Sequence, residues 1–371
     1  MMKIGSHHYL FPFLLSFLML FVTMPEASSS EAPEAKTDTA VEADKGGQHD
    51  THKQEEHAKE EEGSHGHMHP LLFVIIALII GAATRHFSHK SPLPYTVTLF
   101  LIGLGLGAIE RLYGFWGASP LSHAVSWAGN VNPHMILYVF LPTLIFEAAF
   151  AMDVHTFKKS FWNAFIMAVP GILLAIFLSG GLVIGLKHLG VGFGDWGWTL
   201  ALLFGAVISA TDPVAVVSLL KELGAGKKLS TLIEGESLLN DGTAIVLFLL
   251  FSTILTSTSG GSLGGAILSF LKVALGGVLL GGVVGYLTLS WIKKVFNDPM
   301  IEISVVVAAA YLTFFVAESF LQVSGVLGLV TFGLMMAGIG KTRVSPEVEH
   351  FLHEFWELAS FIANTLIFIM V

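Results

Sequence analysis

The sequence contains no cysteine and few charged residues. Because none of its 371 residues is a thiol, disulfide bonds, thiolate metal sites and cysteine nucleophiles are all excluded. Charged residues make up only 13% of the chain, whereas a soluble domain carries about 25%. The alternation of apolar and polar residues that a transmembrane barrel requires is also missing. These deficits disfavour both a soluble globular domain and a membrane barrel.

Long apolar runs take the place of the missing charge. Hydrophobic residues make up 53% of the chain and the mean hydropathy is +0.72. About 20 residues of helix cross the hydrocarbon layer, and a helix satisfies its own backbone there. The sequence therefore predicts an all-α polytopic membrane protein with ten spans. We place them at about 71–87, 94–112, 133–152, 161–186, 197–220, 232–256, 266–292, 300–318, 320–340 and 354–371.

The first 69 residues are read as processing and linker segments. A basic residue at Lys3, an apolar core over 9–22 and small residues at 27–29 predict a signal peptide over residues 1–29. Residues 30–69 are acidic and histidine-rich and have almost no large apolar residues, which predicts a disordered extracytoplasmic tail. The net charge of −9 comes mainly from this tail, and it argues against a nucleic-acid partner.

Histidines in the tail leave two interpretations open. Imidazoles could form a loose metal-binding tract, or they could belong to a solvated low-complexity spacer, which needs fewer assumptions. The residues concerned are His49, His52, His57, His65, His67 and His69.

Basic residues are distributed unevenly between the loops. With the amino terminus outside, the cytoplasmic loops carry eleven lysines and arginines, and the opposite loops and their flanks carry three. This positive-inside bias supports a multi-pass protein of the plasma or inner cell membrane, with the lipid bilayer as its surroundings and the mature amino terminus extracytoplasmic. The eleven are Arg85, Lys90, Lys158, Lys159, Lys221, Lys227, Lys228, Lys293, Lys294, Lys341 and Arg343; the three are Arg111, Lys187 and Lys272.

Two aspartates lie inside predicted spans. A charged group at the bilayer centre costs at least about 2.5 kcal/mol, so such residues usually mark an ion or proton path. Asp212 precedes Lys221 by nine residues, and Asp241 follows Leu232 by nine. Each aspartate is therefore roughly 13 Å from the cytoplasmic end of its span. Equal depth is what a shared ion-binding site requires.

Pro213 directly follows Asp212 and removes a backbone donor within the span. A helix interrupted there would free the carbonyls near Ser209 and Thr211, which could then coordinate a cation. A simple proline kink is the alternative, although a kink needs no acid.

The next span adds polar groups on neighbouring faces. Ser237 and Asp241 are four residues apart and share one face of a helix, while Glu236 and Asn240 share the adjacent face. Oxygen ligands of this kind suit hard cations such as Na⁺, and no soft-metal site is expected within the spans. Ser237 and Asn240 could instead form bonds between helices, and Glu236 is interpreted as an internal ion-pair partner.

Four segments together resemble one known family. They are Ala210–Pro213, Gly235–Asp241, Leu141–Glu147 and the loop Lys221–Ser230. Over residues 71–371 the chain resembles the cation/proton antiporter-1 family, which includes NhaP-type and NHE-type exchangers, and the loop is similar to that of plant salt-tolerance exchangers. The resemblance implies an NhaA-like fold of thirteen helices with inverted repeats, usually dimeric, of which about ten helices are present.

The resemblance also assigns roles to residues. It implies that Asp241 is the essential ion- and proton-binding acid, and that Asp212 and Thr211 complete the polar site beside the helix break. Asn240 before Asp241 is similar to the Asn–Asp pair of electroneutral members. Ser237 and Glu147 match positions that coordinate the cation or line the site.

The carboxyl end departs from the family pattern. The last apolar run reaches Val371 without a polar flank, so we expect a fragment or a truncated gene model. Residues 70–371 form the antiporter domain, with a first core repeat over 161–256 and the second repeat missing. Glu236 would then lack its arginine partner, and this chain alone would not transport.

The sequence therefore predicts a secondary-active Na⁺ or K⁺/H⁺ antiporter rather than an enzyme. Cation and proton would compete at buried carboxylates in electroneutral exchange, without a cofactor, in a homodimer that serves pH homeostasis and salt tolerance. One alternative is a transition-metal transporter that uses the histidine-rich tail, although the span interiors offer oxygens instead. Another is an intramembrane hydrolase, based on Gly192–Asp195, which falls in a loop rather than a helix.

Overall fold

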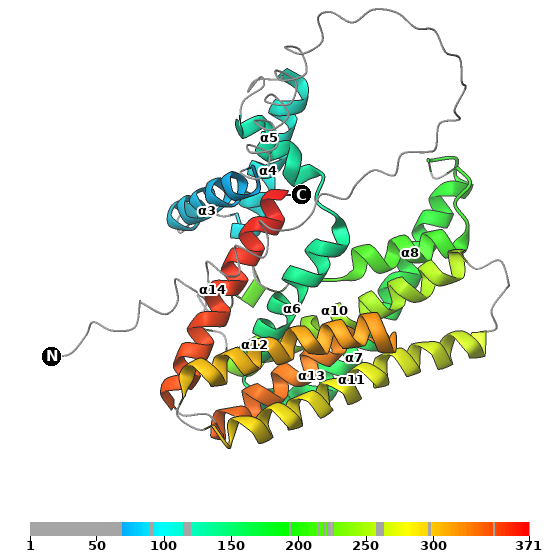
Figure 1. The fold of residues 1–371 in the computed structure, drawn as a ribbon. Helices are drawn as coiled ribbons and strands as arrows, with labels where there is room; N and C mark the ends of the chain where they lie inside the picture. Colours follow the sequence, from blue (N-terminus) through cyan, green and yellow to red (C-terminus); the bar gives the residue numbers. More distant parts are fainter. Residues whose placement is uncertain are drawn as a thin grey trace, which may run out of the picture. The chain divides into compact units, whose positions relative to one another are not determined.

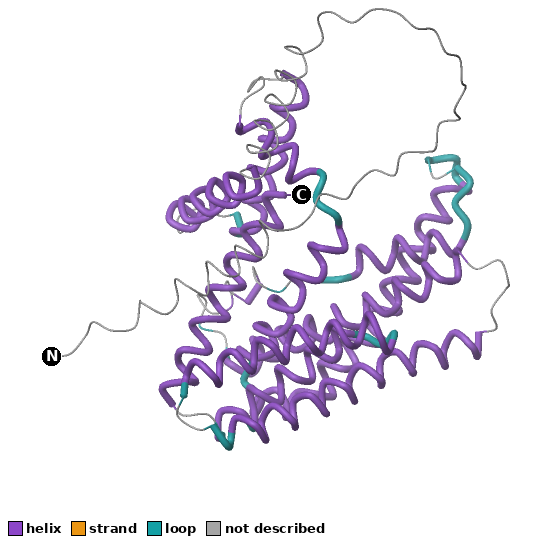
Figure 2. The backbone as a smooth tube through the Cα atoms, viewed as in Figure 1, coloured by secondary structure: helices purple, strands orange, loops and turns teal. Residues whose placement is uncertain are grey.

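The computed structural model describes the membrane domain of the chain. The predicted signal peptide and nearly all of the predicted tail lie outside the described residues, and so does Asp212. Throughout the described part, the backbone forms helices, turns and bends and contains no strand (Figure 2). Described are residues 69–88, 93–113, 120–192, 194–211, 213, 216–217, 220, 224, 226–256, 263–295, 298–343 and 346–370.

Each of the ten predicted spans overlaps a helix (Figure 1), which confirms the all-α fold class. Six of these helices are long and apolar enough to cross a membrane, and α8 and α13 are shorter apolar helices. The short helix α5 was not predicted. The bounds are α3 His69–Ser88, α4 Tyr95–Tyr113, α5 Pro120–Gly129, α6 Pro133–Ala151, α7 Val154–His188, α8 Trp198–Ser209, α10 Lys227–Thr256, α11 Leu263–Ile292, α12 Pro299–Val316, α13 Gly325–Gly338 and α14 Pro346–Met370.

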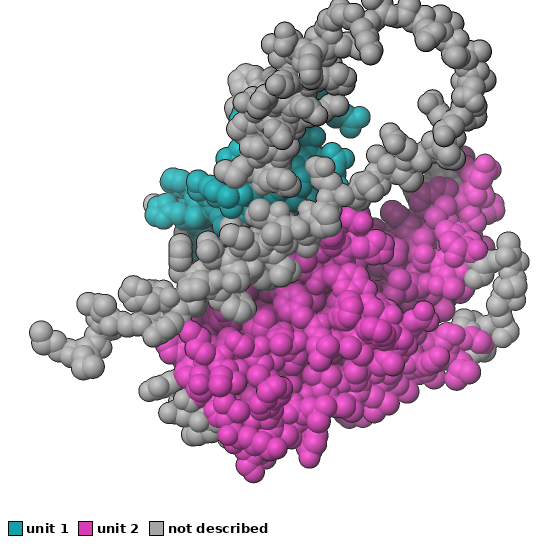
Figure 3. All heavy atoms as spheres, viewed as in Figure 1, with its two compact units in different colours: residues 1–131, 365–371 teal, residues 132–364 magenta. Residues whose placement is uncertain are grey.

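The chain divides into two compact units (Figure 3). Unit 1 comprises residues 1–131 and 365–371, and contains α3, α4, α5 and the end of α14. Within it the Tyr95 hydroxyl hydrogen-bonds Thr365 Oγ1 at 2.6 Å. The Ile369 carbonyl group lies so close to Gly103 of α4 that a side chain at that position would overlap it. Backbone contact of this kind explains the glycine at position 103.

Unit 2, residues 132–364, holds the main apolar core. An aromatic group joins three of its helices, because the Phe146 ring of α6 lies 5.1 Å from Phe332 of α13 and 4.5 Å from Trp356 of α14, centroid to centroid. All three side chains are fully buried. In the same unit α10 packs along α7, and α11 packs along α13 (Figure 1).

Glycines bring α11 and α13 into backbone contact. A Cβ atom at Gly277 would overlap the carbonyl oxygen of Ser324, the residue before α13, and a Cβ atom at Gly281 would overlap the carbonyl oxygen of Gly328 in α13. The Ser324 amide also donates to the Val273 carbonyl at 3.1 Å. We call this contact the α11–α13 glycine seam. Only small residues permit such close approach of two membrane helices.

The connection from α12 to α13 differs from the predicted span boundaries. The ninth span was expected to begin at about residue 320, but Ala317–Leu321 continues α12 as a π-helical turn and α13 begins at Gly325. Gln322 adopts a left-handed conformation with φ 51°, which reverses the chain. The Glu318 carboxylate accepts the Gly325 amide at 2.8 Å, which satisfies a free donor at the start of α13.

Candidate ion-binding site

Helix α8 ends inside the predicted fifth span. It stops at Ser209, and Ala210 is extended, with φ −68° and ψ 134°. Pro213 has no amide proton to continue the helix, and the Val217 amide donates to the Pro213 carbonyl at 2.8 Å. The backbone runs from Ser209 to Pro213, and the Ser209 carbonyl therefore has no amide donor four residues further on. We call this segment the helix break.

Close packing holds both α8 and α10 against α7. A Cβ atom at Gly205 of α8 would lie only 2.8 Å from the Ile176 carbonyl of α7. Gly235 of α10 similarly faces the Phe157 ring of α7, which leaves no space for a side chain. Because both glycines allow helices to approach closely, α10 also packs against α8 and brings its polar face to the helix break.

Two side chains of α10 bind the helix break. Ser237 Oγ donates to the Thr211 carbonyl at 2.7 Å. Asn240 Nδ2 donates to Thr211 Oγ1 at 3.0 Å and to the Ser209 carbonyl at 3.4 Å. Ser237 and Asn240 are each 3% exposed, whereas Thr211 is exposed. The structure therefore brings together three of the site residues expected from the sequence, Thr211, Ser237 and Asn240.

Two shielded oxygens at this junction have no hydrogen-bond partner within the described residues. They are Asn240 Oδ1 and Ser209 Oγ. Native structures rarely leave such atoms unpaired, and each one that occurs calls for an explanation such as a bound ion or water. The Ser209 hydroxyl was not predicted as a site group from the sequence, which pointed only to the carbonyls near this residue. The available signal was that Ser209 stands in the last helical turn before the Asp–Pro motif.

The two candidate acids are described unequally. Asp241 follows Asn240 on α10 and is half-buried. One residue turns a helix by about 100°, so its side chain points to a different side of α10 from that of Asn240. Asp212 lies outside the described residues, and its place in the site stays a prediction. Glu236, also half-buried, forms no ion pair in the described part of the chain.

Glu147 lies in a different environment. It is half-buried on α6, and the Ser360 hydroxyl of α14 hydrogen-bonds its carboxyl group. The carboxylate of Glu357, also on α14, acts on it electrostatically. The contacts that hold Glu147 are therefore separate from the hydrogen bonds that join α10 to the helix break.

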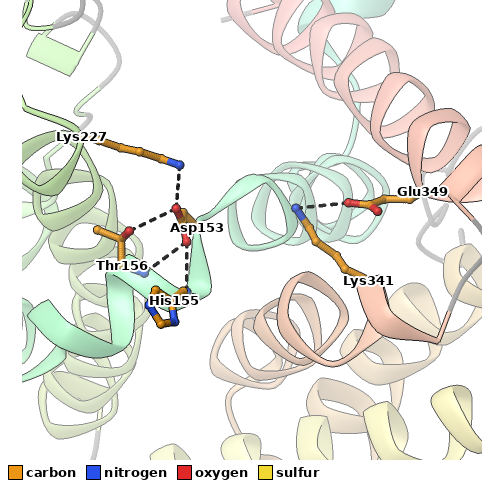
Figure 4. A network of polar contacts seen from close by, with 6 residues as sticks. All are labelled: Asp153, His155, Thr156, Lys227, Lys341 and Glu349. Carbon is orange, nitrogen blue, oxygen red and sulfur yellow. Dashed lines mark hydrogen bonds and ion pairs between the residues drawn. The ribbon is translucent and has the colours of Figure 1, made fainter.

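A polar network holds the first residue of α10 to the start of α7 (Figure 4). Lys227 Nζ lies 2.7 Å from Asp153 Oδ2, and the same carboxylate caps α7 by accepting the amides of His155 and Thr156 at 3.1 and 3.2 Å. The hydrogen bond from Lys227, followed by the one from the Thr156 amide, holds the pKa of Asp153 well below its usual range. We call this pair the α7–α10 clasp.

The alternative hydrolase motif does not form a site. Gly192 and Asp195 are both exposed and lie in the connection between α7 and α8. Gly192 has φ 63°, as expected for a turn glycine. What the helix break offers instead is a set of neutral oxygens beside an acid on α10. Oxygens of this type coordinate hard cations, and a neighbouring acid can exchange a proton for such a cation.

Comparison with known proteins gives consistent relatives. The family model described as "Sodium/hydrogen exchanger, transmembrane" matches residues 74–371. Sodium/hydrogen exchanger 7 of Arabidopsis thaliana is 43% identical over 303 residues, which is 81% of this chain and 26% of that protein. The Na⁺/H⁺ antiporter ApNhaP of Aphanothece halophytica is 33% identical over 302 residues, 80% of this chain and 53% of that protein.

A solved structure shows the same fold. The sodium proton antiporter MjNhaP1 from Methanocaldococcus jannaschii superimposes with a TM-score of 0.65 at 18% identity, over 82% of this chain and 70% of that one. The chain spans between about a quarter and about half of the length of the curated relatives named above. None of these matches favours the alternative of a transition-metal transporter. With the family model covering most of its length, the chain belongs to the sodium/hydrogen exchanger family.

Proposed function

We propose that the protein containing this chain exchanges Na⁺ for protons across a membrane as a secondary-active antiporter. The observation that carries the proposal is the contact between α10 and the helix break. Ser237 binds the Thr211 carbonyl, and Asn240, the residue before Asp241, binds the Thr211 hydroxyl. The family membership and the names of the relatives support the same activity.

Competition for one set of oxygens would couple the two ions. Asp241 would bind either a proton or the cation, with Asp212, Thr211, Ser237 and Asn240 completing the coordination. A cation neutralises the carboxylate as a proton does, so each excludes the other. If the site opens to the two sides in turn in either loaded form, exchange follows without covalent chemistry. Glu147 would line the path from its position on α6, and Glu236 would form a structural ion pair.

A flux assay tests the activity. The complete gene product that carries this sequence is expressed in everted vesicles, and proton flux is followed after addition of Na⁺ or K⁺. Asp241→Asn should abolish cation-triggered flux, because the amide cannot take up or release the proton. Asp195→Asn, at an exposed residue between α7 and α8, is the matched control and should leave flux unchanged. Undiminished flux in Asp241→Asn would remove this residue from the mechanism.

Electroneutral exchange is the finer part of the proposal. It is motivated by the neutral Asn240 beside Asp241, because this pair of neighbours then holds one acid, Asp241, which takes up one proton or one monovalent cation per cycle. Initial rates of Na⁺-driven proton flux are compared at zero and at imposed membrane potential. Equal rates support one-for-one exchange, whereas rates that scale with the potential contradict it.

The membrane setting and assembly belong to the same proposal. The basic loops favour an extracytoplasmic amino terminus in the cell membrane, and we propose a homodimer in the bilayer. A cysteine introduced at the exposed position His155 distinguishes the two orientations by its reaction with a thiol reagent that cannot cross the membrane. The chain has no native cysteine that would react in its place. Labelling of this position from outside intact cells would reverse the assigned topology.

A further inference from the structure

Two histidines meet where α3 and α5 pack together in unit 1. His69 is the first residue of α3 and His123 lies on α5, and their ring centroids are 5.1 Å apart. Four residues further along both helices, the Phe73 and Trp127 rings also pair, at 6.1 Å. Since both pairs advance by one turn together, α3 and α5 run side by side in the same direction. The histidine pair is therefore set by helix packing and not by one flexible side chain.

Shielded polar atoms without partners flank this pair. Within the described residues, His69 Nδ1 is inaccessible to solvent and has no hydrogen-bond partner, and the same is true of Glu110 Oε2 on α4. The other Glu110 oxygen accepts a hydrogen bond from Ser122, the residue before His123. An unpaired buried polar atom costs about 1–3 kcal/mol, so the unpaired ring nitrogen of His69 indicates a missing binding partner.

The separation of the rings fits one shared metal ion. Zinc binds imidazole nitrogen at about 2.0–2.1 Å in tetrahedral geometry, which places each ring centre about 3.2 Å from the ion and two ring centres about 5.2 Å apart. The observed centroid distance of 5.1 Å agrees with this value. Neutral imidazole also binds zinc-like divalent cations in preference to hard cations such as Na⁺, Mg²⁺ or Ca²⁺.

We propose that His69 and His123 bind one divalent transition-metal ion of the zinc type at the α3–α5 junction. No third histidine or acid among the described residues completes a cluster of three ligands, so water supplies the remaining coordination.

This site is distinct from the exchange site in chemistry. Its ligands are nitrogens of unit 1, whereas the helix break in unit 2 offers oxygens. A metal held here would tie the beginning of α3 to α5, and binding to the folded form alone would raise its stability with the logarithm of the metal concentration once that concentration exceeds Kd. The role is therefore that of a stabilising or sensing site, and the metal is not the transported ion.

The test measures metal binding directly. The full chain is purified through a tag that contains no histidine, reconstituted in lipid nanodiscs and titrated with Zn²⁺ by calorimetry. Co²⁺ is then added as a probe whose visible absorption reports tetrahedral coordination. His123→Ala is the main variant, because His123 is exposed and its loss leaves the helix packing intact. His69→Ala is the second variant, and His134→Ala, at an exposed histidine of α6, is the matched control.

We expect one Zn²⁺ per chain, and a Kd that rises at least about tenfold in His69→Ala and in His123→Ala. Tenfold is the lower limit because replacing a residue that only hydrogen-bonds a metal ligand already lowers metal affinity by about that factor. His134→Ala should bind as the unaltered chain does. A fifth protein, in which His49, His52, His57, His65 and His67 are all alanine, separates the site from the tail. If Zn²⁺ still binds to both His69→Ala and His123→Ala as it binds to the unaltered chain, the proposal is wrong, whatever the result for the tail variant. Absence of binding to the unaltered chain overturns it as well.

Discussion

Replacing Ser237 by alanine removes one oxygen atom from the contact between α10 and the helix break. That oxygen donates to the Thr211 carbonyl at 2.7 Å, and the side chain is only 3% exposed. Interhelical hydrogen bonds in membrane proteins contribute on average about 0.6 kcal/mol and at most about 1.7. The substitution should therefore weaken the arrangement of the helix break by roughly threefold to eighteenfold. The volume removed is small, so the packing of α10 against α7 and α8 should persist.

The assay is the cation dependence of antiport in everted vesicles. Since the hydroxyl positions the Thr211 carbonyl, we expect the Na⁺ concentration for half-maximal flux to rise by that factor, with little change in thermal stability. Thr243→Val is the matched control, because it deletes a buried hydroxyl of the same helix that bonds only within α10, to the Leu239 carbonyl at 2.8 Å. Equal cation dependence in the Ser237 variant and the control would refute the reasoning that this bond organises the site.

Two further predictions concern packing and pH. Gly281→Ala places a methyl group against the Gly328 carbonyl in the α11–α13 glycine seam and should destabilise unit 2 by about 1–3 kcal/mol. Gly282→Ala is the control and should leave stability unchanged, because there is open space beside Gly282. The melting temperatures of the two variants in detergent distinguish them. Asp153→Asn keeps a capping side chain on α7 but loses the ion pair with Lys227. Because the folded-state pKa of Asp153 is depressed, its stabilisation is present above the unfolded pKa of about 3.9 and is lost as the pH falls through the folded value. Unaltered and Asp153→Asn chains should therefore differ in melting temperature at pH 7 and converge in strong acid; a difference that grows on acidification would contradict this sign.

The sequence anticipated the helices better than their ends. Each of the ten predicted spans overlaps a helix, because a helix satisfies its own backbone in lipid and the alternation that a barrel requires is missing. Helix α5 escaped prediction because Pro120–Gly129 is too short to span and has serine, histidine and tryptophan among its apolar residues. The start of α13 was misplaced by five residues, since nothing in the sequence signals that Ala317–Leu321 widens into a π-helical turn.

The sequence predicted the residue types of the candidate site and their spacing along α10, but not which atoms meet. Asp–Pro within an apolar span indicates an interrupted helix, and spacing along α10 identifies which polar residues share a face. Which atoms meet depends on the approach distances set by Gly205 and Gly235, and these follow from the packing of three helices at once. The Ser209 hydroxyl and the pairing of His69 with His123 could not be derived for the same reason.

The hydrogen bond from Ser237 to the Thr211 carbonyl also bears on how fast an ion could leave. A carbonyl oxygen has two lone pairs, so it can accept the serine proton and still face a cation. The serine proton draws electron density from that oxygen and makes it a weaker ligand than a carbonyl held in the same position without this bond would be. Conduction and exchange require binding that is favourable enough for entry and weak enough for release. A ligand weakened in this way favours short residence and rapid turnover over tight capture.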